Sequence, residues 1–243
     1  MSLLDTLSSV LLVHAHPDDE TITTGALAAE LVARGIRVYL LTATRGERGE
    51  VVAGPLFALA GTDALSLERE RELDRAASAL GLTERFWLGE APARAAGRTP
   101  RHYGDSGMTW IRPGLAGPAL DVDAAALVRA PHAEVAADVT ALLSHLTPSL
   151  VISYDNGGGY GHPDHVRVHE ITLAATRRTG TPFAEIVSDP GAADEWFTLD
   201  RHLGTVTAAL RCHASQLTVQ GAHIVHSGGQ REEITASVGL RTP

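Results

Sequence analysis

The sequence predicts one α/β domain of the Rossmann-like, doubly wound type, with a mostly parallel sheet, a long loop insertion and a short C-terminal extension. Two observations support this class. The length of 243 residues is typical of a single domain. Short apolar runs also alternate along the chain with segments whose apolar residues recur at helical spacing. Such alternation is typical of a parallel sheet covered by helices.

The first predicted unit is a strand, a helix and a second strand. Residues 10–13 form an apolar run that is too short for a helix and is bounded by polar residues, which predicts a buried strand. Apolar residues then recur at helical spacing over 27–32, and Gly35 supplies a stop. A second apolar run at 38–43 predicts the next strand. Together the three segments form a βαβ unit.

The next segments predict a helix, a strand and an insertion. Periodic apolar residues over 73–80 predict a helix that Gly81 ends. Residues 86–88 predict a third strand. Residues 89–131 are rich in Gly and Pro and lack periodicity, so we expect a long functional loop or lid there.

Regular structure is predicted again after the insertion. An amphipathic helix is expected over 135–146, a fourth strand over 150–154 and a further helix over 164–177. In the last sixty residues only a strand over 183–187 and a helix over 203–211 are predicted.

We therefore expect one domain over 1–243. Its core would span 9–180, the loop insertion 89–131, and the C-terminal extension 181–243.

Composition excludes several chemistries. All twenty basic residues are arginine, so Schiff-base and P-loop lysines are absent from this sequence. Cys212 is the single cysteine, which excludes zinc sites that need two thiolates. The net charge of −9 and the lack of a basic run argue against a nucleic-acid partner. No membrane span and no signal peptide are predicted, so a cytoplasmic protein is expected.

Two polar clusters follow predicted strands. Residues 15–20 (Ala-His-Pro-Asp-Asp-Glu) come directly after the strand at 10–13, and residues 160–165 (Tyr-Gly-His-Pro-Asp-His) follow the strand at 150–154. Ligands of open α/β sheets bind at the carboxyl ends of the strands. If these two strands are neighbours, both clusters face one crevice.

The clusters carry donors for a metal ion. A catalytic zinc site has three protein ligands and one open position for water. Without thiols, two histidines and one carboxylate are the natural set, which His16, Asp19 and one histidine of the second cluster would supply. The spacing leaves open whether His162 or His165 is that ligand.

A further carboxylate would remain beside the metal as a proton carrier. Spacing alone does not decide between Asp18 and Glu20 for this role. Acidic residues at a helix start also serve ordinary capping. Two histidine–carboxylate clusters at equivalent strand ends nevertheless favour a metal site.

These motifs resemble those of the PIG-L/LmbE-like family of zinc-dependent N-acetylglucosaminyl deacetylases. The resemblance rests on residues 15–20 and 162–165. Within the family, residues 13–20, 105–108, 158–166 and 213–216 are most similar to the mycothiol-pathway enzymes that act on N-acetylglucosaminyl-inositol.

The resemblance implies roles for individual residues. Its zinc ligands would be His16, Asp19 and His165. Asp18 would be the general base, and His162 would stabilise the oxyanion or protonate the leaving group.

Five further residues have implied roles. Tyr160 would polarise the carbonyl, and Asp164 would orient His162. Arg69 and Asp105 fall where mycothiol-type enzymes contact the sugar and inositol hydroxyls, and Glu47 lies in a loop that borders the site. The role of His213 and Gln216, expected on a helix, stays open.

The expected function is therefore zinc-dependent removal of the acetyl group from a small N-acetylglucosamine-type amino sugar. Alternatives are an amidase for a mycothiol-type conjugate or an antibiotic amino sugar, and a sugar-binding protein without catalysis. Two histidines and a carboxylate also form the facial triad of Fe²⁺ oxygenases.

Overall fold

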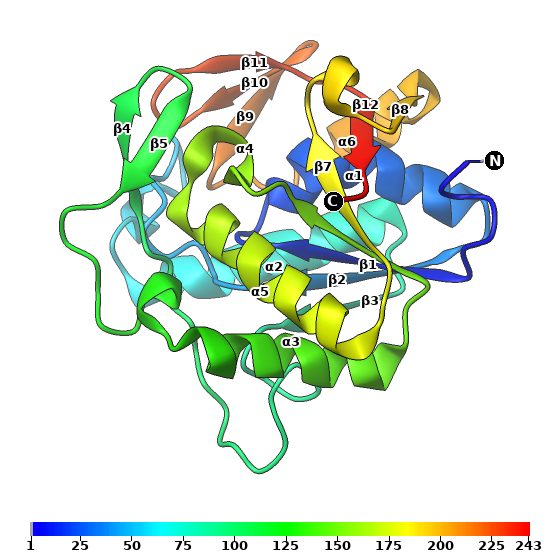
Figure 1. Cartoon of the computed structure of the whole chain (residues 1–243). Helices are drawn as coiled ribbons and strands as arrows, with labels where there is room; N and C mark the ends of the chain where they lie inside the picture. Colours follow the sequence, from blue (N-terminus) through cyan, green and yellow to red (C-terminus); the bar gives the residue numbers. More distant parts are fainter. Residues whose placement is uncertain (1) are drawn as a thin grey trace.

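A computed structural model describes residues 2–243. The central sheet has seven strands in the order β3-β2-β1-β6-β7-β12-β8 (Figure 1). The strands β1, β2, β3, β6 and β7 are mutually parallel, whereas β12 is antiparallel to both of its neighbours. The predicted doubly wound class is confirmed. In sheet order the strands are β3 (Glu84–Trp87), β2 (Arg37–Thr42), β1 (Ser9–His14), β6 (Leu150–Tyr154), β7 (Phe183–Val187), β12 (Ser237–Arg241) and β8 (Glu195–Thr198).

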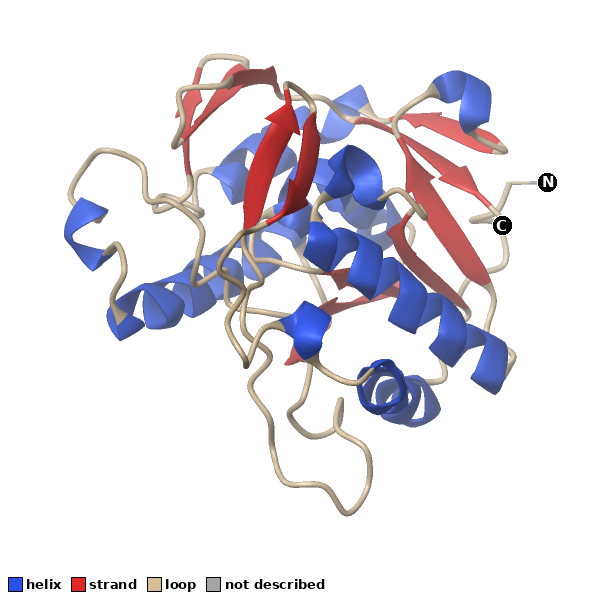
Figure 2. Ribbon diagram, turned by 60° about the vertical axis from the view of Figure 1, so that its left-hand side comes forward, coloured by secondary structure: helices blue, strands red, loops and turns tan. Residues whose placement is uncertain are grey.

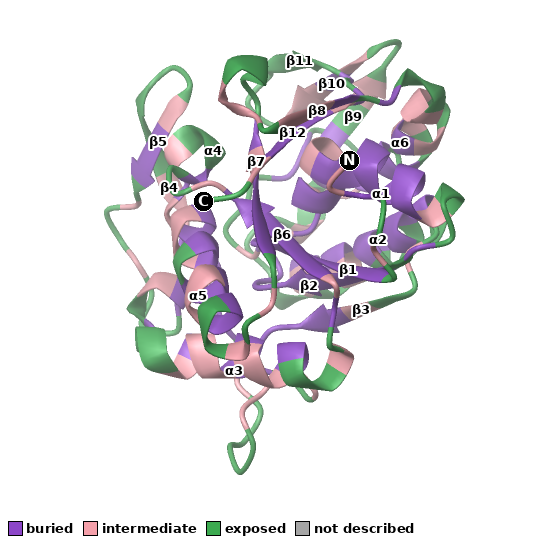
Figure 3. Ribbon diagram, turned by 45° about the vertical axis from the view of Figure 1, so that its right-hand side comes forward, coloured by how far each residue is buried: buried purple, intermediate pink, exposed green. Residues whose placement is uncertain are grey.

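Helices cover both faces of this sheet. One face carries α1 (Asp19–Ala33), α2 (Asp63–Leu80) and α6 (Leu203–Leu210), and the other carries α3 (His132–Leu146) and α5 (Pro163–Thr179). The buried residues gather in the strands and on the helix faces that meet them (Figure 3).

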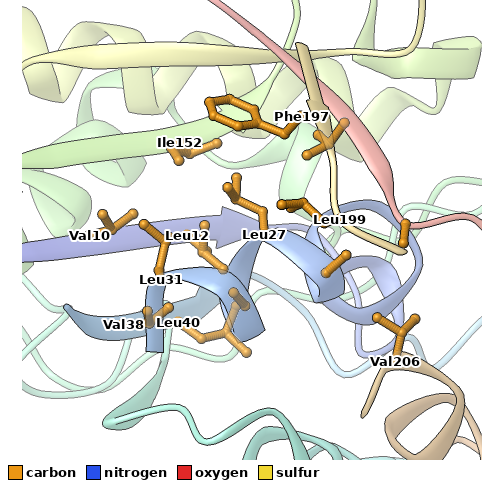
Figure 4. Packing of buried hydrophobic residues seen from close by; sticks show 14 of the residues in the cluster. Val10, Leu12, Leu27, Leu31, Val38, Leu40, Ile152, Phe197, Leu199 and Val206 are labelled. Atoms are coloured by element: carbon orange, nitrogen blue, oxygen red, sulfur yellow. The ribbon is translucent and has the colours of Figure 1, made fainter. Parts of the chain in front are cut away.

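The fold has three layers, with the sheet between two layers of helices, because side chains along β1 alternate between the two faces of the sheet. Val10 and Leu12 point to one face and pack beside Leu27 and Leu31 of α1 (Figure 4). Leu11 and Val13 pack against α3 and α5 on the opposite face. Because both faces are apolar, the strand is a continuous hydrophobic run, as the sequence predicted.

The helix α2 ends where the sequence predicted. Gly81 adopts φ +77°, a left-handed conformation that favours glycine, and its N–H closes the last turn on Ser78.

The insertion differs from the prediction. Residues 89–131 were predicted to lack regular structure, but they contain a hairpin and a short 3-10 helix. The hairpin joins β4 (Met108–Arg112) to β5 (Leu115–Pro118), and the 3-10 helix is η2 (Leu127–Arg129). Nearly all of β4 is exposed, so its sequence lacks the alternation by which a half-buried strand is recognised.

The C-terminal quarter also carries more strands than predicted. The strand β7 and the helix α6 are confirmed, whereas β8, β12 and a separate three-stranded sheet were missed. That sheet consists of β9 (Leu217–Gln220), β10 (His223–His226) and β11 (Arg231–Glu233). These strands have three to five residues each, too few for a clear periodic pattern.

Five short helical turns complete the described chain: η1 (Phe57–Leu59), α4 (Gly158–Gly161), η2, η3 (Pro190–Ala192) and η4 (Asp200–His202). Among residues 2–243, no helix is both long and apolar enough to cross a bilayer.

The chain order makes the pair β1 and β6 a topological switch point of the sheet. From β1 the chain continues through β2 to β3 on one side, and β6 continues to β7 on the other. Ligands of doubly wound folds bind at such a switch point, outside the carboxyl ends of the strands.

Candidate metal centre and active site

The structure brings the two polar clusters together. Because β1 and β6 are paired neighbours, the segments that follow them share one edge of the sheet. The ring centroid of His16 lies 4.6 Å from that of His162 and 5.3 Å from that of His165. A nitrogen from each of these three rings lies within 4.8 Å of the other two.

Asp19 lies between two of these rings. Its Oδ2 is 3.2 Å from Nδ1 of His16 and 3.3 Å from Nε2 of His165. The same oxygen accepts hydrogen bonds from the hydroxyl of Tyr154 at 2.7 Å and from the backbone N–H of His16 at 2.8 Å. The Tyr154 ring stacks on His165, with centroids 4.1 Å apart. These contacts fix the position of the carboxylate.

Asp19 lies at a spacing from His16 and from His165 that suits ligands of a divalent cation. Ligands bound tetrahedrally at zinc-like distances lie about 3.3–3.4 Å from one another, close to the two spacings at Asp19. The Nε2 atom of His165 is buried, and residues 2–243 provide it with no hydrogen-bond partner. A buried imidazole nitrogen without a partner is costly unless it binds something. Two imidazoles and one carboxylate are ligands that divalent metals accept.

The carboxylate of Asp164 orients His16. Its Oδ2 lies 3.2 Å from Nε2 of His16 and accepts the backbone N–H of Ser106 at 2.9 Å. The carboxylate of Asp164 thus contacts His16 and Ser106, and the expected role of Asp164 in orienting His162 stays a prediction. Metal-binding histidines commonly donate their second ring N–H to such a carboxylate, which leaves Nδ1 of His16 facing Asp19.

The backbone of Asp164, by contrast, does contact His162. His162 precedes α5, and its Nδ1 accepts the free N–H of Asp164 at 3.2 Å. The ring proton of a neutral His162 therefore sits on Nε2. Burial, followed by the charges of His16 and His165, lowers the pKa of His162 to about 3. The ring is thus neutral at pH 7 and can donate one hydrogen bond from Nε2.

Asp18 has a carboxylate without a hydrogen bond and an unusual backbone. It caps α1 with φ 101° and ψ −33°, a conformation that non-glycine residues rarely adopt. Its carboxylate accepts no hydrogen bond within the described chain. Burial, followed by the charge of Asp19, raises the pKa of Asp18 to about 7.

Glu20 is placed differently. It is fully buried, and its carboxylate accepts hydrogen bonds from Thr21, from His213 and from the backbone of Asp18. The two carboxylates thus differ: that of Asp18 is free to accept a proton, whereas both oxygens of Glu20 accept hydrogen bonds.

Tyr160 stands at the mouth of the site. Its ring centroid is 5.2 Å from His165 and 5.8 Å from Trp110 of β4, and both Tyr160 (38%) and Trp110 (50%) are partly exposed. The β4–β5 hairpin stands beside α4 (Figure 2). At Gly161 (φ +85°), a Cβ would lie 3.0 Å from the carbonyl of Ala116, so glycine permits this approach.

Two of the predicted substrate-binding residues contact each other. Glu47 accepts the backbone N–H of Asp105 at 3.0 Å through one oxygen and pairs with His102 through the other. The carboxylate of Asp105 accepts the N–H of Gly107 and lies 3.8 Å from Nε2 of His16. Burial raises the pKa of Asp105. Asp105 therefore borders the candidate metal centre, and Glu47 contacts the backbone of Asp105.

Arg69 is buried and holds a loop. Only 2% of the residue is exposed, although it lies in a charged run that typically marks a solvated helix face. Its guanidinium donates to the carbonyls of Gly46, Gly49 and Glu50, the last at 3.0 Å. These contacts place the loop that carries Glu47.

Sequence reasoning missed several residues that shape the site. Tyr154 holds Asp19, and its polar hydroxyl at the end of an apolar strand was a usable signal. Ser106 donates to Asp164 and lies inside a matched motif. His213 and Gln216 were expected on a helix, but both lie in the turn between α6 and β9, where both are buried.

The chain is similar in sequence and in fold to known proteins. The family described as GlcNAc-PI de-N-acetylase, PIG-L, matches residues 11–176. A 1D-myo-inositol 2-acetamido-2-deoxy-alpha-D-glucopyranoside deacetylase of Kineococcus radiotolerans is 46% identical over 71% of this chain and 45% of its own length. A Saccharopolyspora erythraea protein of the same description is 36% identical over 86% of this chain and 77% of its own.

The chain thus spans about half the length of the first of these relatives. Among solved structures, N,N'-diacetylchitobiose deacetylase from Pyrococcus horikoshii aligns with a TM-score of 0.63 at 20% identity. The alignment covers 86% of this chain and 71% of that one, and at this identity it shows a shared fold.

Proposed function

The chain belongs to the PIG-L family of GlcNAc-PI de-N-acetylases, and from that premise we propose that it is a metal-dependent hydrolase that deacetylates an N-acetylglucosamine-type amino sugar. One observation carries the proposal: two histidines and an aspartate converge beside an aspartate whose carboxylate is free. The names of the relatives make N-acetylglucosaminyl-inositol the first substrate to test.

We assign the metal to His16, Asp19 and His165, and propose zinc as the ion. Their donor set and spacing support this assignment. When bound, a zinc ion supplies Lewis acidity that polarises an amide carbonyl and lowers the pKa of water. The hydrogen bonds from Tyr154 to Asp19 and from His16 to Asp164 hold two of the ligands in place before the ion arrives.

Asp18 is the proposed general base. Its carboxylate accepts the proton of the attacking water as the oxygen adds to the acetamide carbon. The side chain of Asp18 makes no capping hydrogen bond at the start of α1, which leaves its carboxylate available to take and return a proton. The bound state of Glu20 argues against the alternative base.

His162 is the proposed oxyanion donor. Its Nε2–H is available because Nδ1 already accepts the backbone N–H of Asp164. A hydrogen bond to the carbonyl oxygen as it becomes negative is worth about two to three powers of ten in rate. Tyr160 at the mouth is a second donor, because a tyrosine hydroxyl with an ordinary pKa of about 10 is protonated at neutral pH. The proton held by Asp18 then passes to the amine, and acetate and the free amino sugar leave.

Glu47 and Asp105 are the proposed contacts for sugar hydroxyls. Asp105 lies 3.8 Å from Nε2 of His16, and the carboxylate of Glu47 accepts the backbone N–H of Asp105. Arg69 acts on the substrate indirectly in this proposal, because its guanidinium is engaged by the loop that carries Glu47.

Acetate release tests the proposal. Purified protein is loaded with zinc and offered a panel of N-acetylglucosaminides, a mycothiol-type conjugate and an acylated antibiotic amino sugar, with and without a chelator. We expect chelator-sensitive acetate from at least one N-acetylglucosaminide. Release of a different acyl group would favour the amidase alternatives. Turnover that requires oxygen and Fe²⁺ would favour the oxygenase, and binding without turnover would favour a sugar-binding protein.

A further inference from the structure

A buried chain of hydrogen bonds lies behind Asp18, and the proposed mechanism makes no use of it. Glu20 is fully buried, and its Oε2 accepts the backbone N–H of Asp18 at 3.0 Å. Its Oε1 accepts the hydroxyl of Thr21 at 2.5 Å and lies 3.0 Å from Nε2 of His213. Glu20 thus connects the backbone of the proposed base to a histidine 193 positions later in the sequence.

The conformation of Asp18 requires such a contact. A non-glycine residue with φ 101° persists only where neighbouring groups hold it. The side chain of Asp18 makes no capping hydrogen bond at the start of α1. The carboxylate of Glu20 therefore anchors the N–H of this strained residue.

His213 has a defined tautomer and a defined place. Its Nε2 carries the proton because it faces the carboxylate of Glu20, and Nδ1 lies 3.4 Å from the side-chain amide of Gln216. Its backbone N–H donates to Leu210, the last residue of α6. The imidazole is 0% exposed, so it has no route to the substrate and acts only through Glu20.

The same turn also contacts α2 and the chain segment after Glu47. Ser215 donates to Glu72 from its N–H at 2.6 Å and from its hydroxyl at 2.7 Å. The Nε of Arg69 lies 3.4 Å from the Ser215 hydroxyl, and the rest of the guanidinium holds the loop of Glu47. The backbone carbonyl of Ser215 also accepts the N–H of Val52.

We propose that the turn at residues 213–216 is a positioning element with two arms. His213 acts through Glu20 to hold Asp18 where it can accept a proton, and Ser215 acts through Arg69 to hold the loop of Glu47. The proposal rests on the proposed function, because it takes Asp18 as the base.

The two arms have different kinetic consequences. Removal of the imidazole leaves a buried carboxylate short of one donor, and Glu20 then shifts and releases the backbone of Asp18. Because only the base moves, kcat falls while substrate binding does not change. Removal of the Ser215 hydroxyl loosens the loop of Glu47 instead, so KM rises.

The experiment compares His213→Ala, His213→Gln and Ser215→Ala with a matched control. The control is His202→Gln, since His202 also pairs with a buried glutamate of α1, Glu30, at 2.8 Å but has no contact with Asp18. For each variant we measure kcat, KM, the metal content and the melting temperature.

We expect His213→Ala to lower kcat about tenfold or more, with KM within about twofold of wild type and a full complement of metal. Added imidazole should restore part of its kcat, and His213→Gln, which keeps a donor, should be intermediate. Ser215→Ala should raise KM about threefold or more, and His202→Gln should keep both constants.

Wild-type kcat in a folded, metal-loaded His213→Ala would overturn the inference and leave the proposed function standing. A loss traced to missing metal would overturn it as well. If His213→Ala does not fold, the comparison of His213→Gln with His202→Gln decides. An equal loss of kcat in these two variants would show that His213 has a purely structural role. Wild-type protein that releases no acetate from any substrate would overturn the proposed function and this inference with it.

Discussion

Nε2 of His16 lies 3.2 Å from the carboxylate of Asp164, so the opposite ring nitrogen, Nδ1, faces Asp19. Asp164 is itself fixed by the N–H and hydroxyl of Ser106, at 2.9 and 2.5 Å. A proposed metal ligand, His16, is therefore oriented by a residue from α5, although His16 itself follows β1. The pairing of β1 with β6 is what makes this contact possible.

Asp164→Asn should weaken metal binding about 10- to 100-fold without unfolding the protein. The amide cannot accept the Nε2–H of His16 as strongly as a carboxylate, so the ring loses its orientation. Titration of the metal-free protein with Zn²⁺ measures the change. Asp189→Asn is the control, because Asp189 is exposed and caps a short turn far along the chain. Equal affinity in both variants would contradict the assigned role of Asp164.

Asp18→Asn and Asp19→Asn should separate the base from the ligand. Asp18→Asn keeps all three proposed ligands, so it should bind metal normally and lose about two to four powers of ten in kcat. Asp19→Asn removes a ligand and should lose the metal. Elemental analysis of dialysed protein gives the metal content beside the kinetics. A metal-free Asp18→Asn, or a metal-loaded Asp19→Asn, would exchange the two assignments.

Trp110→Ala should raise KM for substrates whose aglycone contains a ring. Trp110 and Tyr160 present partly exposed rings 5.8 Å apart at the mouth of the site, and an aromatic contact is worth about 0.5–1.5 kcal/mol. A KM increase of about 2- to 10-fold is expected with an unchanged kcat. The comparison uses N-acetylglucosaminides with a methyl group and with a ring as aglycone. An equal effect on both would show that Trp110 does not contact the aglycone.

Glu30→Gln should destabilise the protein at pH 7 by on the order of 2 kcal/mol. Burial acts to raise the pKa of Glu30, but hydrogen bonds from Arg201, His202 and Arg34 outweigh it and lower the pKa to about 2. A depressed carboxyl pKa stabilises the fold above the unfolded value of about 4.3, and this contribution is lost as the pH falls towards 2.

Urea unfolding at several pH values measures this difference. The difference in the free energy of unfolding between wild type and Glu30→Gln should become smaller below about pH 4. Glu68→Gln serves as the control, because Glu68 pairs only with the exposed side chains of Arg71 and Arg75. A gap that does not depend on pH would contradict the ionic origin of the effect.

The sequence was informative where local pattern and burial agree. The segments that form β1 and β6 are apolar on both faces. Because these strands pair, the polar clusters that follow them lie together at one edge of the sheet. The hairpin at Trp110 was not predicted, because its first strand is mostly exposed and its sequence does not alternate between apolar and polar residues.

Other features depend on contacts that no local pattern encodes. Arg69 lies in a run of charges yet is buried, because a loop from another part of the chain covers its guanidinium. His213 pairs with Glu20 across 193 positions, so its role becomes visible only in the folded chain. The partner of Asp164 is likewise set by the approach of β1 to β6.

The most direct test of the central claim is acetate release from N-acetylglucosaminyl-inositol by the wild-type protein and by Asp18→Asn, each metal-free and reloaded with Zn²⁺. The account predicts acetate and free amine in equal amounts from the reloaded wild type. It predicts almost none from the metal-free wild type or from reloaded Asp18→Asn. Equal rates in Asp18→Asn and wild type, or turnover that survives metal removal, would contradict it.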